Sequence, residues 1–322
     1  MATAVATSPS TPKRAAPSSS RRRARRRATI WGYVFLLPLI LIFGGFTLWP
    51  IVASWGYSFF DWDGVGPPED FVGLANFSEA LGSASFWNAF GNSFLFSLGA
   101  LLVELPLALI LALVLNNTLL RGRNVYRLAF FLPVVATTAV IGMVIAVLLS
   151  PVGGVVNEAL RSIGLIDRPI NFLGSPSTAL PTVIGVDIWK GFGITLIYWL
   201  AALQTVPKDL YEAAKLDGAS PRQQLASVTL PVLMPLAVVI LLLTFQRSLN
   251  TFDLVQSMTG GGPVYSTDVV PTYIYRYAFD PVSAAPRYGF ACAVGVVFGL
   301  FTLLITLLQG PLLAGRMRKS AA

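Results

Sequence analysis

Residues 94–115 read FLFSLGALLVELPLALILALVL, a stretch in which Glu104 is the only charged side chain. A helix rises about 1.5 Å per residue, so about 20 apolar residues are enough to cross the hydrocarbon core of a bilayer. The rest of the chain has the same character, because 55% of its 322 residues are apolar and only 12% are charged. A soluble domain carries about 25% charged residues. We therefore expect an all-α integral membrane protein.

Five further stretches of similar length are mostly apolar, and together with the first they predict six membrane-spanning helices. The predicted helices cover residues 31–54, 94–115, 128–149, 183–203, 232–249 and 288–308. Asp187 and Lys190 lie inside the fourth helix, and the fifth ends near Arg247. The first helix is too long for the apolar core of a secretory signal peptide, so we expect it to be retained.

Lysine and arginine residues lie mostly on one side of these predicted helices. Of the 23 basic residues, eight precede the first helix, and three each fall in the second connection, in the fourth connection and after the last helix. By the positive-inside rule this side is the cytoplasm. We expect both termini there, with a disordered basic tail at 1–29, a six-helix domain at 30–315 and a short tail at 316–322.

The block RRRARRR at residues 21–27 has two interpretations. Clustered arginines bind nucleic acid or acidic lipid, and they also anchor the orientation of a neighbouring membrane helix. We favour the anchor, because the arginines closely precede a predicted spanning helix. The net charge of +8 then requires no nucleic-acid partner.

The sequence offers few residues for covalent chemistry. It contains no histidine, which is the commonest general base and metal ligand. Its one cysteine, Cys292, excludes an internal disulfide and a cysteine-rich zinc site. No P-loop sequence is present, so we expect no ATPase site within this chain. We expect no catalytic residue, and no metal or cofactor held by the chain itself.

Residues 207–231, PKDLYEAAKLDGASPRQQLASVTLP, lie on the predicted cytoplasmic side. Pro207 is suited to begin a short helix, and Gly218 is suited to end it in the left-handed conformation. Ser220 followed by Gln223 forms a capping-box pattern that begins a second helix. The alanines between these signals are small enough for a partner to approach the backbone. The stretch predicts a helical hairpin that docks a partner, the alternative being a loop that packs on the chain's own helices.

The same stretch resembles the EAA loop of binding-protein-dependent ABC importer permeases. Glu212-Ala213-Ala214 is followed at the family's spacing by Gly218 and by Leu230-Pro231, while Val228 stands where the family has isoleucine. By this resemblance the loop is the coupling-helix hairpin that contacts an ATPase. The residues assigned to that coupling are Glu212, Ala213, Ala214, Asp217, Gly218, Ala219, Leu230 and Pro231.

Two further stretches, DGAS at 217–220 and MTGGGP at 258–263, are similar to the carbohydrate, or maltose-type, subgroup of that family. The resemblance implies a permease subunit of an ATP-driven importer in a bacterial cell membrane, which moves a sugar or sugar-like solute inward by alternating access. It also implies a second, usually unlike permease subunit, two cytoplasmic ATPase subunits that hold ATP and Mg, and an outer solute-binding protein. The large outer domain of one maltose-type subunit is absent, since the connection at 59–85 is short.

Polar residues in the fourth and fifth predicted helices are candidates for contact with the solute. Asp187 and Lys190 lie three residues apart on one helical face, where they can pair with each other or face the pathway. The fifth helix ends in the polar stretch QRSLNTFD at 246–253. The resemblance, together with this stretch, places the substrate pathway at Thr138, Asp187, Lys190, Gly191, Gln246, Asn250, Thr251 and Asp253. The alternative is that these residues hold two permease subunits together.

Other features have structural interpretations. We expect Glu104 to satisfy a neighbouring helix, and Gly295-x-x-x-Gly299 to permit close helix packing. The alternative function is a secondary transporter driven by an ion gradient, a class in which internal repeats and broken helices are common. No internal repeat is evident here, and the hairpin has no purpose in that interpretation.

Overall fold

The computed structural model describes residues 19–117, 119–279 and 285–320. The chain divides into two compact units, Met1–Ala53 and Ser54–Ala322. The described residues form helices joined by loops, with one isolated β-bridge within a loop and no strand. Within this part the fold is all-α, as the sequence predicts.

The first unit is helical from its first described residue. It holds α1 (Ser19–Phe43), the π-helical turn η1 (Gly44–Leu48) and most of α2 (Trp49–Tyr57). The prediction of a disordered tail is wrong for residues 19–28, which extend the spanning helix toward the N-terminus. Arginine and alanine are good helix formers, so the helix continues beyond its apolar part. Residues 1–18 of the predicted tail lie outside the described residues.

The second unit contains the remaining helices. Its first half consists of α3 (Ala75–Gly82), α4 (Ala84–Gly99), the π-helical turn η2 (Ala100–Glu104), α5 (Leu105–Asn116), α6 (Arg123–Val135), α7 (Thr138–Leu148) and α8 (Val155–Ser162). Its second half consists of α9 (Pro176–Leu203), α10 (Lys208–Leu216), α11 (Pro221–Gln224), the π-helical turn η3 (Leu225–Thr229), α12 (Leu230–Leu249), α13 (Asp253–Met258), α14 (Val270–Phe279) and α15 (Tyr288–Ser320).

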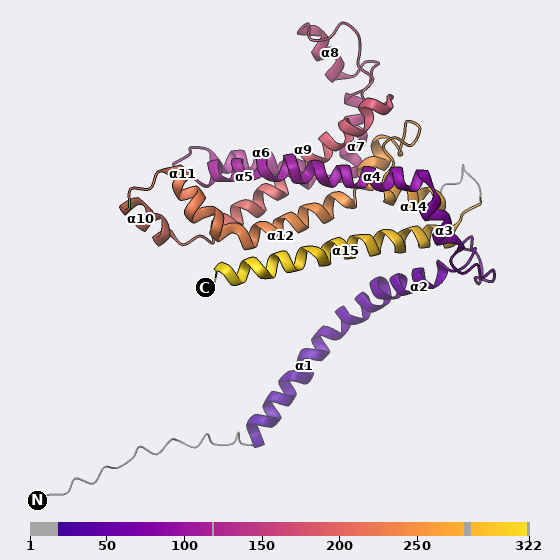
Figure 1. Cartoon of the computed structure of the whole chain (residues 1–322), viewed down its shortest axis with the longest axis horizontal. Helices are drawn as coiled ribbons and strands as arrows, with labels where there is room; N and C mark the ends of the chain where they lie inside the picture. Colours follow the sequence, from indigo (N-terminus) through magenta and orange to yellow (C-terminus); the bar gives the residue numbers. More distant parts are fainter. Residues whose placement is uncertain (1–18, 118, 280–284, 321–322) are drawn as a thin grey trace, which may run out of the picture. The chain divides into compact units, whose positions relative to one another are not determined.

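The long helices of this unit pack side by side. In Figure 1, α4 and α5, α9, α12 and α15 run in the same general direction and contact one another. The short helices α10 and α11 lie at one end of the unit, and α3 and α14 lie at the other. The C-terminal end of α15 lies toward α10 and α11, while α7 and α8 project to the side.

Five helical stretches are long and apolar enough to cross a membrane, and a sixth is broken. The five are Thr29–Tyr57, Ala84–Asn116, Pro176–Leu203, Pro221–Met258 and Tyr288–Leu307. The prediction of a continuous helix at 128–149 is wrong, because α6 and α7 meet at a bend of 96°. Pro133 lacks the N–H that would continue the helical ladder, and Ala136 and Thr137 then adopt extended backbone.

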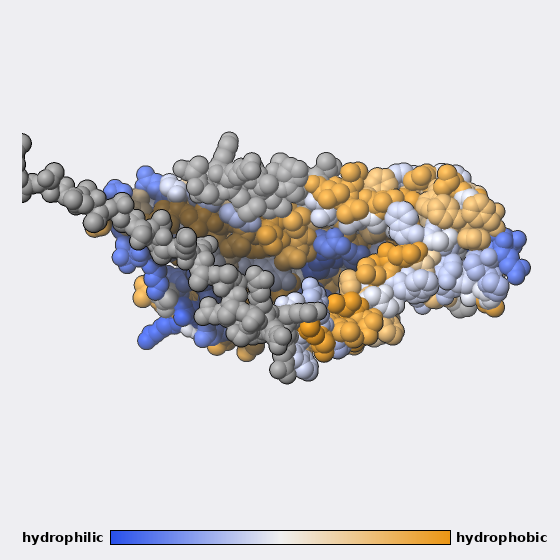
Figure 2. Space-filling model, turned by 90° about the horizontal axis from the view of Figure 1, so that it is seen from below, coloured by the Kyte–Doolittle hydropathy of each residue, from blue (hydrophilic) through white to orange (hydrophobic). Residues whose placement is uncertain are grey.

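Two of the three hydrophobic clusters of the second unit pack its long helices together. One gathers aromatic side chains of α4, α14 and α15, including the fully buried Phe86, Tyr273 and Phe290. The other packs α5, α9 and α12 through small and branched residues such as Ala112 and Leu196. Figure 2 shows hydrophobic side chains over much of the surface of the helices. Such a surface suits the hydrocarbon of a bilayer.

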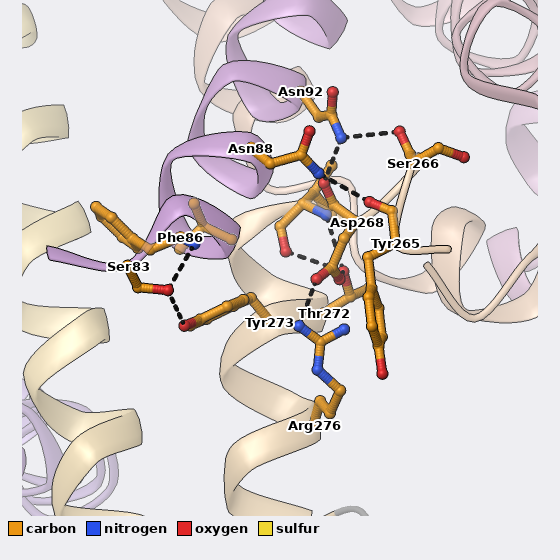
Figure 3. A network of polar contacts seen from close by, with 12 residues as sticks. Ser83, Phe86, Asn88, Asn92, Tyr265, Ser266, Asp268, Thr272, Tyr273 and Arg276 are labelled. Carbon is orange, nitrogen blue, oxygen red and sulfur yellow. Dashed lines mark hydrogen bonds and ion pairs between the residues drawn. The ribbon is translucent and has the colours of Figure 1, made fainter. Parts of the chain in front are cut away.

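The glycine-rich stretch after α13 forms a loop that α4 holds in place (Figure 3). The Asn92 amide donates to the carbonyl oxygens of Ser266 at 3.0 Å and Asp268 at 2.8 Å. The Asn88 amide donates to the carbonyl oxygen of Tyr265 at 2.8 Å. Two asparagines one helical turn apart on α4 therefore fix the loop backbone at three carbonyl groups between residues 265 and 268.

The loop is also fixed by α14. Asp268 is buried, accepts a hydrogen bond from the Thr272 hydroxyl at 2.6 Å and pairs with Arg276 at 2.7 Å. Burial raises the pKa of the Asp268 carboxyl, while Thr272 and Arg276 act in the opposite direction. The Arg276 guanidinium lies over the Tyr265 ring, 4.0 Å from its centroid. A loop that contacts two helices in this way is a rigid part of the end of the unit.

We predict that Asn92→Ala loosens this loop more than Asn88→Ala does. Asn92 is 6% exposed and makes two hydrogen bonds, so its loss leaves buried carbonyl groups without donors, at a cost of about 1–3 kcal/mol. Asn88 is exposed, so water replaces its single bond. Thermal unfolding of the purified variants in detergent compares the two. Equal unfolding midpoints would contradict the anchoring role of Asn92.

Candidate functional site

Arg247, near the end of α12, lies between two carboxylates from other spans. Its Nη2 is 2.6 Å from Glu104 Oε2, and its Nη1 is 3.1 Å from Asp187 Oδ1. The Ser248 hydroxyl donates to the other oxygen of Asp187 at 3.1 Å. The carboxylates are almost completely buried, whereas the Arg247 side chain is 31% exposed. We call Glu104, Asp187 and Arg247 the charge cluster, and it joins the α4–α5 stretch, α9 and α12.

The π-helical turn η2 ends at Glu104 and contributes that residue to the charge cluster. The N–H of Leu105 bonds to the carbonyl of Ala100, five residues back, so this turn is wider than an α-helical one. The second oxygen of Glu104 accepts from the Thr195 hydroxyl of α9 at 2.6 Å. The prediction that Glu104 satisfies a neighbouring helix is confirmed. The sequence did not reveal that Arg247 is its charged partner.

Gly191 of α9 leaves the space that the guanidinium occupies. A Cβ atom at this position would collide with the Arg247 side chain. The sequence left open whether Asp187 pairs or faces the pathway, and in the structure Asp187 pairs with Arg247 of α12, while Lys190 lines the cavity described below. An arginine offers several N–H donors in a planar fork, so it can bind two carboxylates at once. A lysine carries a single ammonium group and is less suited to bridge two carboxylates.

A cavity of about 300 Å³, here called the inner cavity, opens beside the charge cluster. It lies where the end of α6, the beginning of α7, α9 and the end of α12 meet. Seven of the predicted pathway residues line it: Thr138, Asp187, Lys190, Gly191, Asn250, Thr251 and Asp253. Arg247 and Phe252 of the polar stretch at 246–253 also line it, and the remaining lining residues, which the sequence did not single out, are Val134, Ile194 and Leu254.

Gln246 is the one predicted pathway residue that does not line the inner cavity. It lines a neighbouring cavity instead, and Asn250 and Phe252 belong to both cavities. Helical geometry explains the separation, since Gln246 and Arg247 are adjacent in sequence and point about 100° apart around α12. The helix α12 ends at Leu249, so Asn250 no longer follows the helical rotation, and it lines both cavities. Contact of any of these residues with a solute stays a prediction.

The broken span contributes directly to the inner cavity. Val134 precedes the break and Thr138 follows it, and both line the cavity. Irregular backbone at membrane depth is tolerated where it lies within protein or lines a water-filled cavity. With the amide of Asn250, the hydroxyls of Thr138 and Thr251 and the Phe252 ring, the inner cavity presents donors, acceptors and an apolar surface. This combination suits a polyhydroxylated ligand.

The predicted helical hairpin is present as α10 and α11. Gly218 has φ of +75°, as expected for the left-handed end of a helix. The N–H of Gly218 bonds to the carbonyl of Lys215, and the N–H of Ala219 bonds to that of Ala214, which together form a Schellman motif. Pro207 was expected to be the first residue of this helix. It is instead the N-cap, and the helix begins at the next residue, Lys208.

The second helix of the hairpin begins with the predicted capping box. The Gln223 side chain accepts from the N–H of Ser220 at 2.8 Å, and the Ser220 hydroxyl accepts from the N–H of Gln223 at 3.4 Å. The hydroxyls of Tyr211 and Thr229 lie 2.8 Å apart and connect the first helix to η3. The turn is thus held by its own backbone and side chains.

The turn of the hairpin is open to a partner. Glu212, Ala213, Asp217 and Gly218 are exposed, and Ala214 and Ala219 are half-buried. Leu216, at the end of α10, is 89% exposed, although the sequence analysis did not single it out. The sequence signal for this exposure was the position of an apolar residue between two charged ones, Lys215 and Asp217. Leu230 and Pro231, also assigned to coupling, lie instead in the first turn of α12.

Comparison with known proteins agrees with this architecture. Residues 104–319 match the family described as "Binding-protein-dependent transport system inner membrane component". The lactose transport system permease protein LacF of Rhizobium radiobacter is 32% identical over 304 residues, covering 94% of this chain and 99% of that protein.

Two crystal structures resemble the fold. One is of a bacterial ABC transporter involved in the import of the acidic polysaccharide alginate, with a TM-score of 0.78, 29% identity and coverage of 91% of this chain and 98% of the other. The second is of a bacterial alginate ABC transporter in complex with an alginate pentasaccharide-bound periplasmic protein. Its TM-score is 0.76, with 29% identity and coverage of 89% and 94% of the two chains.

We predict that Arg247→Met destabilises the protein by about 3 kcal/mol, because it leaves two buried carboxylates without their cation. A matched control is Arg287→Met, which removes a pair with Glu79 whose side chains are 35% and 49% exposed. Exposed pairs contribute about 1 kcal/mol or less. Thermal unfolding in detergent measures both variants. Equal losses would show that the charge cluster does not hold the three spans together.

Proposed function

Because the chain belongs to the family of binding-protein-dependent transport system inner membrane components, we propose that it is the permease subunit of an ATP-driven importer of a sugar or sugar-like solute. The observation that carries the proposal is the exposed, self-capped hairpin that joins α9 to α12. These two helices also supply Asp187 and Arg247 at the inner cavity. A partner that moves the hairpin therefore acts on the helices that line the cavity.

The proposal includes the partners that complete such an importer. Two cytoplasmic ATPase subunits bind ATP and Mg and contact the hairpin, so this chain has no ATPase site of its own. A second, unlike permease subunit completes the pathway, and lipids surround both. A solute-binding protein delivers the solute at the end with α3 and α14, opposite the hairpin. The presence of a pentasaccharide-bound periplasmic protein in the related alginate complex supports such a partner. The hairpin and both termini then face the cytoplasm, and no nucleic acid takes part.

Import then proceeds by alternating access. ATP binding closes the ATPase pair and brings the hairpins together, which opens the inner cavity outward to receive the solute. Hydrolysis and product release return the spans to the inward-facing arrangement. The residues of this chain supply a transient binding site and a gate, and they carry out no covalent chemistry. The broken span is a feature shared with secondary transporters, but the family and the hairpin favour ATP-driven import.

The charges of the inner cavity favour a neutral solute. Arg247 is bound by Glu104 and Asp187, and Asp253 lines the cavity together with Lys190. Three carboxylates thus accompany two cations, which leaves no cation in excess for an acidic sugar. Carboxylates and amides instead accept from and donate to sugar hydroxyls. LacF is named for a neutral sugar, and the related crystal structures are described for an acidic one.

We predict that Gly218→Val abolishes co-purification of the ATPase, whereas Gly164→Val preserves it. Gly164 is a matched control because its φ is +71°, it also follows a helix end, and neither glycine has an atom within 4 Å of an added Cβ. Both variants incur similar backbone strain of about 1–2 kcal/mol, so only the position of the strain differs. The measurement is ATPase recovered with the tagged permease complex from detergent extracts.

Leu216→Ser provides a second variant without backbone strain. Leu216 is exposed, so the substitution should leave unfolding unchanged and weaken ATPase retention. Equal ATPase recovery with Gly218→Val, Gly164→Val and Leu216→Ser would contradict docking at the hairpin. Failure of the wild-type chain to retain any ATPase would reject ATP-driven import altogether.

We further predict that neutral oligosaccharides stimulate the importer and acidic ones do not. The assay measures ATP hydrolysis by the complete complex with its binding protein in nanodiscs, in the presence of lactose, maltotriose or alginate oligosaccharides. Stimulation by the neutral sugars alone is the expected result. Stimulation by alginate oligosaccharides alone would show that the charge balance of the inner cavity does not select the solute.

A further inference from the structure

A second cavity, here called the outer cavity, lies between the end of α12, α14 and α15, and has a volume of about 560 Å³. Four of its lining side chains are aromatic, and the rings of three of them, Phe252, Tyr275 and Phe279, lie in a row. The ring centroids of Phe252 and Tyr275 are 5.3 Å apart, and those of Tyr275 and Phe279 are 5.5 Å apart. Tyr275 and Phe279 are also exposed. Such rings present apolar faces on which the C–H face of a sugar ring can stack.

Polar and small residues complete the outer cavity. Gln246 and Asn250 line it with exposed amide groups. The NH2 group of Asn250 donates to the backbone carbonyl of Gln246 at 2.9 Å, which leaves the Asn250 amide oxygen and the Gln246 amide for a further partner. Polar groups that face hydrocarbon without such a partner are costly, so their exposure within a span favours contact with water or a polar ligand. Gly299 lines the same cavity, and no atom lies within 4 Å of a Cβ added there. Gly299 therefore borders open space, whereas a Cβ added at Gly295 would lie 3.8 Å from the Ile274 side chain of α14, so the predicted close packing applies to Gly295 alone.

The outer cavity has a neighbouring cavity on each side. Toward the inner cavity, Asn250 and Phe252 line both spaces. In the other direction, the Phe279 ring lies 5.2 Å from that of Tyr288, which lies 6.0 Å from that of Trp62. Trp62 in turn lines a third cavity of about 650 Å³ together with acidic residues of the loop before α3. A line of aromatic rings thus connects this loop to the inner cavity.

We propose that the outer cavity is a sugar-ring subsite through which the solute passes before it reaches the inner cavity. Tyr275 and Phe279 stack on the apolar face of the ring, while Gln246 and Asn250 hydrogen-bond to its hydroxyl groups. Two successive cavities of this size accept linked sugar rings, so the preferred solute class is a neutral oligosaccharide. This inference rests on the proposed function and specifies the route of the same solute.

The test uses the single cysteine of the chain. In a Cys292→Ala background, Gly299→Cys places a thiol in the outer cavity and Thr138→Cys places one in the inner cavity. Leu304→Cys is the matched control, because Leu304 is 53% exposed on the same helix but about 140° around it from Gly299. The complete complex with its binding protein is treated with a charged, membrane-impermeant thiosulfonate, with and without maltotriose or lactose. A thiol that faces lipid or a packed helix does not react, since the reagent requires water and the thiolate.

The expected result is labelling of the thiols at 299 and 138 but not at 304, with labelling at both sites slowed severalfold by at least one of the two sugars. Labelling and sugar protection at 138 without labelling at 299 would overturn the outer subsite and leave the proposed function intact. Labelling at 299 that neither sugar slows would also overturn it. Absence of labelling at both 138 and 299 would contradict the proposed function as well.

Discussion

Charges inside a membrane protein are stable only when they find partners, and the charge cluster around Arg247 satisfies this requirement for three spans at once. Glu104 and Asp187 are almost completely buried, and each binds the same guanidinium. An isolated ionised group in hydrocarbon costs several kcal/mol, so the three helices that carry these residues must keep their relative rotation and depth. The inner cavity lies directly beside the cluster, so its shape depends on the same ion pairs.

The hairpin and the inner cavity are connected by the same two helices, α9 and α12. The hairpin joins the end of α9 to the beginning of α12, and these helices meet again at the Asp187–Arg247 pair. Because the hairpin is capped by its own residues, a force on it is transmitted to both helices instead of being absorbed by the turn. The loop after α13 is fixed by α4 and α14 in a similar way, which gives the opposite end of the unit a rigid frame.

Much of this arrangement follows from local sequence signals. Six spans were predicted from the lengths of the apolar stretches, and five of them are continuous helices in the structure. The hairpin was predicted from the turn chemistry of Gly218 and the Ser220–Gln223 pair. Both kinds of feature depend on neighbouring residues only. The break between α6 and α7 was missed, since its sequence VVATTAV at 134–140 contains no charged residue and no glycine, and proline occurs within many membrane helices. The partner of Asp187 was also missed, because Lys190 is close in sequence while Arg247 is 60 residues away and becomes a neighbour only through packing.

The central claim is that a sugar occupies the inner cavity beside the neutralised Arg247. The most direct measurement is an electron cryo-microscopy structure of the complete complex, trapped with its binding protein and with a sugar that stimulates its ATP hydrolysis. We predict density for a sugar ring within hydrogen-bonding distance of Asn250 or Lys190, with Arg247 still bound to Glu104 and Asp187. Sugar density that lies away from this cavity, or an Arg247 released from both carboxylates to bind the sugar, would contradict it.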